Sequence, residues 1–282
     1  MRLSTLRHDR DAAGMTYVYP VVSRRAGGVS IGVNLNPNNA CNWRCVYCQV
    51  PNLTLGKGPD IDLDLLESEL DLMLGAIFEG DYMESHVPEG SRRVNDVAFS
   101  GNGEPTSSPC FVEAVERVIE VLSRREATRG QKIILITNGS LVHQAPVQTG
   151  LELLGKASGE VWFKLDSATT AGLEHMNGAK TAPERTARNL TRCAERTPTW
   201  IQTMMLQRDG LPPTESELSA YESFLRDRIR EGVQLAGILL YGLARKSYQP
   251  EAPTLTPLPA AWMASFAERL REATGLEVRP SL

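Results

Sequence analysis

Residues 30–48 read S-I-G-V-N-L-N-P-N-N-A-C-N-W-R-C-V-Y-C. The first part, Ser30–Asn36, is a short run rich in apolar and β-branched residues, which predicts a buried strand that ends before Pro37. The second part is a polar loop in which Cys41, Cys45 and Cys48 have the spacing C-x3-C-x2-C. In an α/β barrel, the loops at the C-terminal ends of the strands build the active site.

Outside this segment, apolar runs alternate with segments of helical period, which indicates parallel strands covered by helices. The further strands that we expect are Val94–Ser100, Lys132–Thr137, Val161–Leu165, Trp200–Leu206 and Ala236–Tyr241. The expected helices are Asp62–Phe78, Phe111–Arg125, Gln148–Lys156, Pro183–Arg196 and Glu215–Glu231. Six strand–helix units predict an α/β fold, a partial (β/α)6 barrel similar to a TIM barrel, with right-handed crossovers.

Segments at both ends are expected to extend this barrel. Thr16–Val22 and the turn Ala26–Gly28 predict a hairpin that leads into the first barrel strand, and Ala260–Ala273 predicts an amphipathic helix before a short strand, Leu276–Arg279. The expected parts are therefore an N-terminal extension, the barrel and a C-terminal extension that packs on it, residues 1–29, 30–245 and 246–282.

The composition is that of an ordinary globular protein, with 41% hydrophobic and 23% charged residues in a chain of 282. The net charge of −4 argues against nucleic-acid binding by bulk electrostatics but leaves room for a local basic groove. No apolar run approaches the roughly 20 residues that cross a bilayer, and no secretory signal is evident. Three of the five cysteines lie within eight residues, so we expect metal binding in a reducing cytoplasm rather than disulfides.

Three thiolates at this spacing can bind three irons of a [4Fe–4S] cluster and leave the fourth iron open for an exogenous ligand. A cluster used only for electron transfer usually has a fourth cysteine. The remaining cysteines, Cys110 and Cys193, fall in expected helices or just before one. The alternative from another class is a non-catalytic iron–sulfur or zinc-binding module, although structural zinc normally has four ligands and no His or Cys follows at finger-like spacing.

Two polar loops follow the next strands. Ser100–Thr106 reads S-G-N-G-E-P-T, and its glycines would let backbone groups approach a ligand closely. The same residues could simply form a sharp turn with a helix cap. Thr137–Ser140 reads T-N-G-S, in which Asn138 is a candidate ligand group for ribose hydroxyls or a plain turn residue.

The fourth strand carries charges that a buried parallel strand rarely holds. Alternation places Lys164 and Asp166 on one face, with Ser167 next in the chain. Such charges are costly unless they are paired or functional, so they form an interior ion pair, line a substrate cavity or contact a cofactor. Gln202 in the fifth strand and Arg245 after the sixth are further candidates near the barrel mouth.

The pattern C-x3-C-x-aromatic-C after the first strand resembles the signature of the radical S-adenosylmethionine (SAM) superfamily. The segments F-S-G-N-G-E-P-T, I-T-N-G, K-L-D-S and M-N-G, which start at Phe99, Ile136, Lys164 and Met176, are most similar to the wyosine-synthase-type group that modifies tRNA. The likeness runs from about Ser30 to Gly242. Members that make the tricyclic wyosine base carry a second cluster on extra N-terminal cysteines, which this sequence lacks, so the resemblance is to a single-cluster member.

The resemblance implies a barrel of the radical SAM type and a role for each candidate residue. The cluster ligands would be Cys41, Cys45 and Cys48. The SAM-binding residues would be Tyr47 beside the adenine, Gly101, Asn102, Gly103 and Glu104 at the methionine amino group, and Asn138, Ser167 and Gln202. Asn102 stands where the family has a glycine, and Tyr47 could equally serve only to cover the cluster. The candidate catalytic residues, chosen for their place in the fourth strand and at the barrel mouth, are Lys164, Asp166 and Arg245.

The implied activity needs an external one-electron donor, a flavodoxin or ferredoxin. Reductive cleavage of SAM would give methionine and a 5′-deoxyadenosyl radical that takes a hydrogen atom from a substrate. The family likeness suggests a tRNA base. A basic rim for it, or simply a set of ordinary solvated charges, is offered by Arg24, Arg25, Arg92, Arg93, Arg245 and Lys246. A small molecule or a peptide fits the acidic composition as well.

Overall fold

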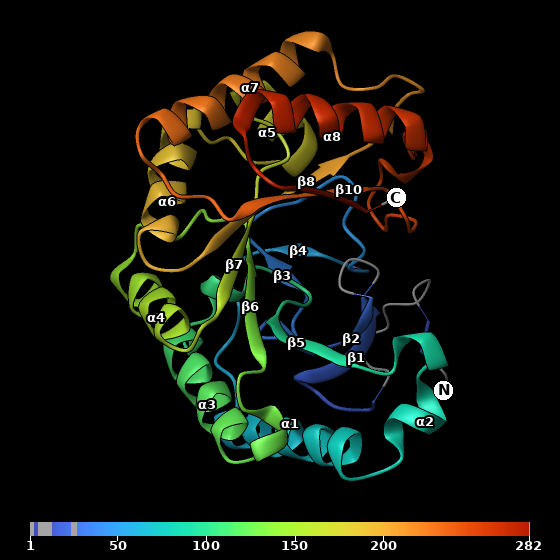
Figure 1. Ribbon diagram of the computed structural model, residues 1–282, viewed down its shortest axis with the longest axis vertical. Coiled ribbons are helices and arrows are strands. Elements are labelled where there is room, and N and C mark those ends of the chain that lie inside the picture. The colour runs from blue at the N-terminus through green and yellow to red at the C-terminus, as the bar shows by residue number, and fades with distance from the viewer. Residues whose placement is uncertain (1–2, 5–12, 24–26, 282) are drawn as a thin grey trace. The chain divides into compact units, whose positions relative to one another are not determined.

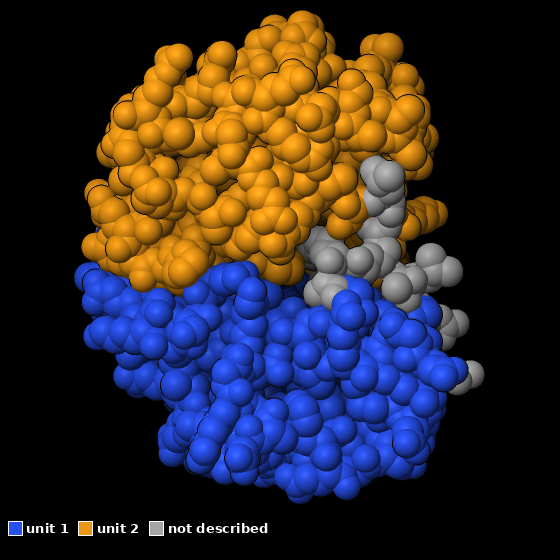
Figure 2. Space-filling model, in the orientation of Figure 1, with its two compact units in different colours: residues 1–42, 56–136, 144–160 blue, residues 43–55, 137–143, 161–282 orange. Residues whose placement is uncertain are grey.

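The computed structural model describes residues 3–4, 13–23 and 27–281 (Figure 1). The chain divides into two compact units, which Figure 2 colours separately. Unit 1 comprises residues 1–42, 56–136 and 144–160, and unit 2 comprises residues 43–55, 137–143 and 161–282. Within the described part of the chain, no helix combines the length and the apolar character needed to span a membrane.

The strands of unit 1 lie in the order β1-β2-β5-β6. β1 (Val18–Ser23) runs antiparallel to β2 (Gly28–Val33), so the expected hairpin is confirmed, although Arg24, Arg25 and Ala26 lie outside the described residues. β5 (Val94–Phe99) is parallel to β2, and β6 (Lys132–Thr137) is parallel to β5. Both parallel strands begin at the predicted residues.

The first barrel strand ends earlier than the sequence predicts. β2 stops at Val33 instead of Asn36, because asparagine side chains take over the hydrogen bonding beyond it. Asn34 Oδ1 accepts from the backbone N of Asn36 at 3.1 Å, and Asn36 Nδ2 donates to the carbonyl of Ala40 at 3.0 Å. This self-bonded loop replaces the last part of the predicted strand and fixes the chain just before Cys41.

The helices of unit 1 are α1 (Leu63–Phe78), the short α2 (Tyr82–His86), α3 (Phe111–Ser123) and α4 (Ala145–Lys156). They pack beside its strands, with α1 next to α3, α3 next to α4, and α2 against α1 (Figure 1). Asp62, which precedes the apolar stripe of α1, caps the helix by accepting from the backbone N of Asp64 and Leu65. Leu66 and Leu70 on that stripe are fully buried.

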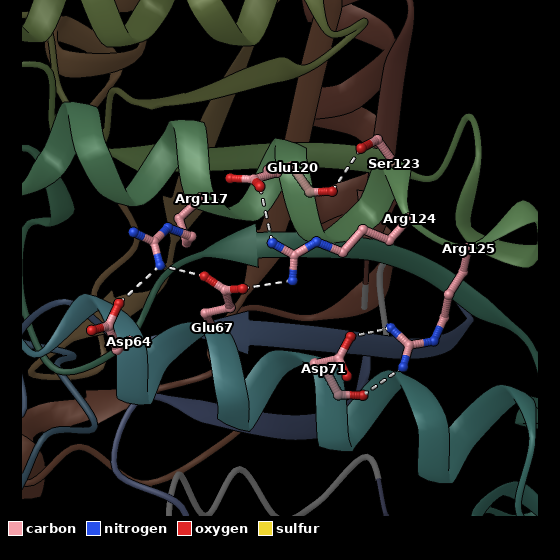
Figure 3. Close-up of polar contacts among 8 residues, drawn as sticks. All are labelled: Asp64, Glu67, Asp71, Arg117, Glu120, Ser123, Arg124 and Arg125. Carbon is pink, nitrogen blue, oxygen red and sulfur yellow. Dashed lines mark hydrogen bonds and ion pairs between the residues drawn. The ribbon is translucent and has the colours of Figure 1, made fainter.

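An acid–arginine network joins the outer faces of α1 and α3 (Figure 3). Glu67 of α1 contacts both Arg117 and Arg124, the latter at 2.6 Å, while Arg125 pairs with Asp71. Hydrogen bonds from Arg124 and Arg117 lower the pKa of the Glu67 carboxyl. These groups are partly exposed, and ion pairs near the surface contribute little to stability.

The strands of unit 2 are parallel and lie in the order β7-β8-β10-β12. They are β7 (Glu160–Lys164, whose first residue belongs to unit 1), β8 (Thr199–Met205), β10 (Gly237–Gly242) and β12 (Val278–Ser281). Its helices are α5 (Thr170–Asn177), α6 (Pro183–Ala194), α7 (Glu215–Arg230) and α8 (Ala260–Thr274). Each predicted strand and helix of this unit is present, with its ends at the predicted residues or within two residues of them, as is usual for element boundaries.

Short elements complete the chain and were not predicted. They are the two-residue strands β3 (Ala40–Cys41), β4 (Thr54–Leu55), β9 (Gln207–Arg208) and β11 (Leu255–Thr256), with 3-10 turns at Glu89–Ser91, Pro105–Ser107, Glu126–Thr128 and Ala252–Thr254. In unit 2, β9 and β11 pair antiparallel and hold the chain after β8 to the chain before α8. Elements this short carry too little periodicity to be seen in a sequence.

Candidate functional site

The end of α5 supports the cysteine loop, which we define as residues 43–50. The backbone N of Val46 donates to the carbonyl of Met176 at 2.9 Å, and that of Arg44 donates to Asn177 at 3.0 Å. Gly178 ends the helix with φ of 62°, and a Cβ there would lie 3.1 Å from the Arg44 carbonyl oxygen. The backbone of the M-N-G segment therefore holds the loop by hydrogen bonds. A residue larger than glycine at its last position would come too close to the Arg44 carbonyl oxygen.

A second segment, residues 247–251, holds the cysteine loop from another direction; we call it the strap. Ser247 Oγ donates to the carbonyl of Val46 at 2.7 Å, and the backbone N of Tyr248 donates to that of Cys48 at 2.9 Å. Gln249 Nε2 donates to a further loop carbonyl at 3.3 Å. The carbonyl groups of Val46, Cys48 and Val50 thus have hydrogen-bond partners on the strap, which ties the loop to this segment.

An ion pair closes the strap on the loop. Arg44 and Glu251 form a two-pronged contact, with nitrogen–oxygen distances of 2.8 and 2.7 Å. The hydrogen bond from Arg44 lowers the pKa of the Glu251 carboxyl. Planar two-point pairing gives geometric specificity in addition to charge attraction. Sequence analysis missed the strap, because a polar stretch some 200 residues away carries no local sign of where it binds.

Behind the loop lies a buried polar network. The Tyr47 hydroxyl donates to Asp166 Oδ2, and Lys164 Nζ lies 2.7 Å from the Tyr47 oxygen, 3.3 Å from that of Tyr241 and 3.8 Å from Asp166 Oδ2. Asp166 Oδ1 accepts from the backbone N of Met204 at 2.9 Å. The predicted common face of Lys164 and Asp166 is confirmed, and the two charges form an interior ion pair.

The network sets the charge state of its members. Burial alone would lower the pKa of Lys164, but the Asp166 charge, with Tyr241 and Cys45 nearby, raises it above its ordinary value. Lys164 is therefore a cation at neutral pH. Burial raises the pKa of the Cys45 thiol to about 11, although the Lys164 charge acts in the opposite direction. A metal that binds Cys45 must displace this proton.

Asn177 connects the network to Cys45. Its side chain is fully buried, and Nδ2 donates both to Asp166 Oδ2 at 2.7 Å and to Cys45 Sγ at 3.2 Å. The sequence motif M-N-G drew attention to this position only as part of a family pattern. Its contacts depend on α5 returning to the cysteine loop, which no local pattern reveals.

In unit 1, the glycine loop (residues 100–106) packs against the segment that leads to Cys41. A Cβ at Gly101, whose φ is 156°, would lie 2.3 Å from Asn34 Oδ1, and a Cβ at Gly103 would lie 2.0 Å from the Ala40 carbonyl oxygen. Asn102 donates from its backbone N to Asn34 Oδ1 at 3.0 Å. Only glycine fits these two positions, because the Asn34 side chain lies close to Gly101 and the Ala40 backbone lies close to Gly103.

The other two residues of this loop are also held in place. Asn102 Nδ2 donates to Asn39 Oδ1 at 2.7 Å, so the departure from the family's glycine adds a bond to the neighbouring segment. Glu104 is buried and accepts from Thr106 at its backbone N, 3.2 Å, and its hydroxyl, 2.6 Å. The sequence alternative of a turn with a helix cap is therefore observed, and it leaves a preoriented carboxylate beside the glycines.

Replacing Gly103 with alanine is expected to reduce the free energy of unfolding by about 1–3 kcal/mol, because the methyl group would overlap the Ala40 carbonyl oxygen and force the loop to move. Urea denaturation of both proteins measures the difference. Gly90→Ala is the matched control, since nothing lies within 4 Å of its Cβ position. Equal stability of the two variants would contradict the packing role of Gly103.

Asn138 lies in a tight turn after β6. Its Oδ1 accepts from the backbone N of Ser140 at 3.0 Å, so the plain turn expected as an alternative is present. Gly139 has φ of 70°, and a Cβ there would lie 2.1 Å from the Phe163 ring. Asn189 of α6, which sequence analysis missed, donates to the Gly139 carbonyl at 2.8 Å. The turn is thus fixed from two sides within unit 2.

The remaining predicted residues do not all join the network around Cys45. Ser167 Oγ donates to Glu217 Oε2 of α7 at 2.7 Å, a partner that was not predicted. Gln202 is buried in β8, where its backbone oxygen accepts from Leu165 at 3.0 Å. Arg245 is half-buried after β10.

The thiols of Cys41, Cys45 and Cys48 are groups of the kind that bind iron–sulfur clusters. All five cysteines are free thiols, and Cys41, Cys45 and Cys48 are half-buried. Among residues 3–4, 13–23 and 27–281, no three or more His, Cys, Asp or Glu side chains converge on one metal ion. Binding a cluster does not require the ligands to meet at one metal ion, because each thiolate binds a different iron.

Comparison with known proteins gives one family. The family model described as Radical SAM superfamily matches residues 35–210. A UPF0026 protein of Helicobacter pylori is 28% identical over 159 residues, which is 56% of this chain and 44% of that protein. A UPF0026 protein of Synechocystis is 25% identical over 161 residues, covering 57% and 52% of the two chains. The chain therefore spans about half the length of these relatives.

Two solved structures share the fold. A radical SAM methyltransferase from Sphaerobacter thermophilus has a TM-score of 0.62 at 15% identity, covering 90% of this chain and 66% of the other. A structure described as native anSMEcpe with bound AdoMet and Kp18Cys peptide has a TM-score of 0.51 at 14% identity, covering 88% and 63%. The expected α/β partial barrel of the radical SAM type is confirmed.

The match to the family model covers more than half of the 282 residues. The family match supports an enzyme, whereas the finer likeness to wyosine synthases stays a prediction. This chain belongs to the radical SAM superfamily, whose enzymes use a [4Fe–4S] cluster and SAM.

Proposed function

We propose that Cys41, Cys45 and Cys48 hold the [4Fe–4S] cluster and that this chain cleaves SAM reductively to remove a hydrogen atom from a substrate. When reduced by one electron from a flavodoxin or ferredoxin, the cluster supplies the electron that splits SAM into methionine and a 5′-deoxyadenosyl radical. The observation that carries the proposal is the double support of the cysteine loop by α5 and the strap. Such support preorganises Cys45 and Cys48 before the metal arrives.

In this proposal, each candidate SAM-binding residue contacts a different part of SAM. The hydroxyl of Tyr47 is engaged by Asp166 and Lys164, so any contact with the adenine of SAM would use its ring. The Glu104 carboxylate, with Gly101, Asn102 and Gly103 before it, would accept from the ammonium group of SAM. Asn138, Ser167 and Gln202 would contact the remaining polar groups of SAM.

The ion pair of Lys164 and Asp166 would place two charges near the reacting groups while the site stays free of water. Each charge has its partner inside the protein, so neither needs solvent to stabilise it. We place Arg245 at the substrate side, since it follows β10 at the C-terminal end of that strand.

For the substrate, we propose a tRNA base, with a small molecule or a peptide as the competing outcomes. Lys246 is exposed beside Arg245 in unit 2. In unit 1, Arg92 donates to backbone carbonyls and Arg93 to Asn95, so these two arginines are partly used by the fold. Arg24 and Arg25 lie outside the described residues. We expect the enzyme to work in a reducing cytoplasm, which keeps its thiols free.

The test is anaerobic incubation of the reconstituted protein with SAM and dithionite. We expect 5′-deoxyadenosine and methionine in equal amounts, with faster formation when unmodified tRNA is added. Stimulation by a peptide or metabolite pool instead of tRNA would replace the substrate proposal and leave the chemistry intact. An intact cluster that yields no 5′-deoxyadenosine would favour a non-catalytic iron–sulfur module.

A further inference from the structure

The side-chain amide of Asn177 offers two hydrogens to two acceptors. Its Nδ2 lies 2.7 Å from Asp166 Oδ2 and 3.2 Å from Cys45 Sγ. A carboxylate only accepts, so the Asp166 contact requires nitrogen at this position and fixes the orientation of the amide. The second hydrogen is thereby directed at the sulfur.

The environment makes this contact strong. Asn177 is fully buried, and no described residue donates to its Oδ1. The hydrogen bonds of the amide side chain are therefore those that its NH2 group donates. Its backbone is fixed as well, because its carbonyl accepts from Arg44 at 3.0 Å and Gly178 follows in the left-handed region. A buried donor that cannot rotate away keeps its hydrogen bond in both charge states of its acceptor.

We infer that Asn177 is a positioning residue that raises the reduction potential of the cluster by donating a hydrogen bond to the Cys45 thiolate. This inference rests on the proposed role of Cys45 as a cluster ligand. Taking up one electron adds one negative charge to the thiolate-bound cluster, and hydrogen bonds to the cysteine sulfurs stabilise that charge. Asp166 works in the opposite direction, since its carboxylate accepts from the same amide group and brings a negative charge near the sulfur.

The test is a redox titration of anaerobically reconstituted protein, followed by electron paramagnetic resonance. Asn177→Leu keeps a similar volume and removes both donors. We expect its midpoint potential to fall so that the ratio of reduced to oxidised cluster at fixed potential drops about tenfold, which is about 59 mV for one electron. Asn177→Ser, which keeps one shorter donor, should show a smaller fall in the same direction.

The control is the double variant Arg44→Gln, Glu251→Gln. It removes the ion pair that holds the same loop, keeps the net charge of the pair at zero and leaves Cys45 Sγ untouched. We expect its midpoint potential to equal that of the wild type. A purely structural role for Asn177 would shift the control as much as the Asn177 variants.

The outcomes separate the inference from the proposed function. A wild-type protein that holds no iron would end the proposed function before Asn177 is tested. An unchanged midpoint potential in whichever Asn177 variant holds the cluster overturns the inference alone. Folded Asn177→Leu and Asn177→Ser proteins that both fail to hold a cluster would make the residue an assembly residue, which also overturns it.

Discussion

Replacing Cys45 with alanine is expected to abolish both the brown chromophore of the reconstituted protein and the reductive cleavage of SAM. Cys45 is the middle cysteine of the C-x3-C-x2-C motif, and its loop is held by the strap and by α5. Two cysteines then remain for a cluster that needs a thiolate on each of three irons. Visible absorption and iron analysis measure the loss, and 5′-deoxyadenosine measures the activity.

Cys110→Ala is the matched control for this experiment. Cys110 is also a half-buried free thiol, but it lies outside the motif, just before α3. We expect it to keep the chromophore and the activity. A Cys45→Ala protein that stays brown and cleaves SAM at the wild-type rate would remove Cys45 from the ligand set.

Replacing Asp166 with alanine is expected to have the largest effect on stability. The Asp166 side chain is completely buried and is the charge partner of Lys164. Its loss leaves a buried cation unpaired and takes the acceptor from the Tyr47 hydroxyl, Asn177 Nδ2 and the Met204 backbone N. Breaking a buried pair in this way lowers the free energy of unfolding by about 3–5 kcal/mol. Urea denaturation of the metal-free protein measures it.

Asp64→Ala provides the comparison on the surface. The Asp64 side chain is 93% exposed and pairs with Arg117 at 3.1 Å, so its removal should change the free energy of unfolding by less than about 1 kcal/mol. If Asp166→Ala were no more destabilising than Asp64→Ala, the buried network would have no part in holding the fold.

Periodicity in the sequence predicted the regular elements because their burial is local and repetitive. Leu66 and Leu70 mark the buried face of α1, and the charges of Lys164 and Asp166 share one face by simple alternation. The predicted end of β2 was wrong, because side-chain hydrogen bonds of Asn34 and Asn36 replace those of the strand, and composition does not show this.

The candidate site was predictable only where its residues are close in sequence. The three cysteines and the glycine loop can be identified from the spacing of their residues in the sequence. Asn177 lies 132 residues from Cys45, and Glu251 lies 207 residues from Arg44, so their contacts exist only after the strands of unit 2 have assembled. Long-range polar partners of this kind leave no periodic signal in a single sequence.

The central claim is that three cysteines hold a cluster with one iron open to SAM. Electron paramagnetic resonance of the dithionite-reduced protein, recorded with and without SAM, tests it most directly. We predict about four irons per chain and a reduced-cluster signal that changes when SAM is added. One bound zinc without iron, or a cluster signal that SAM leaves unchanged, would contradict it.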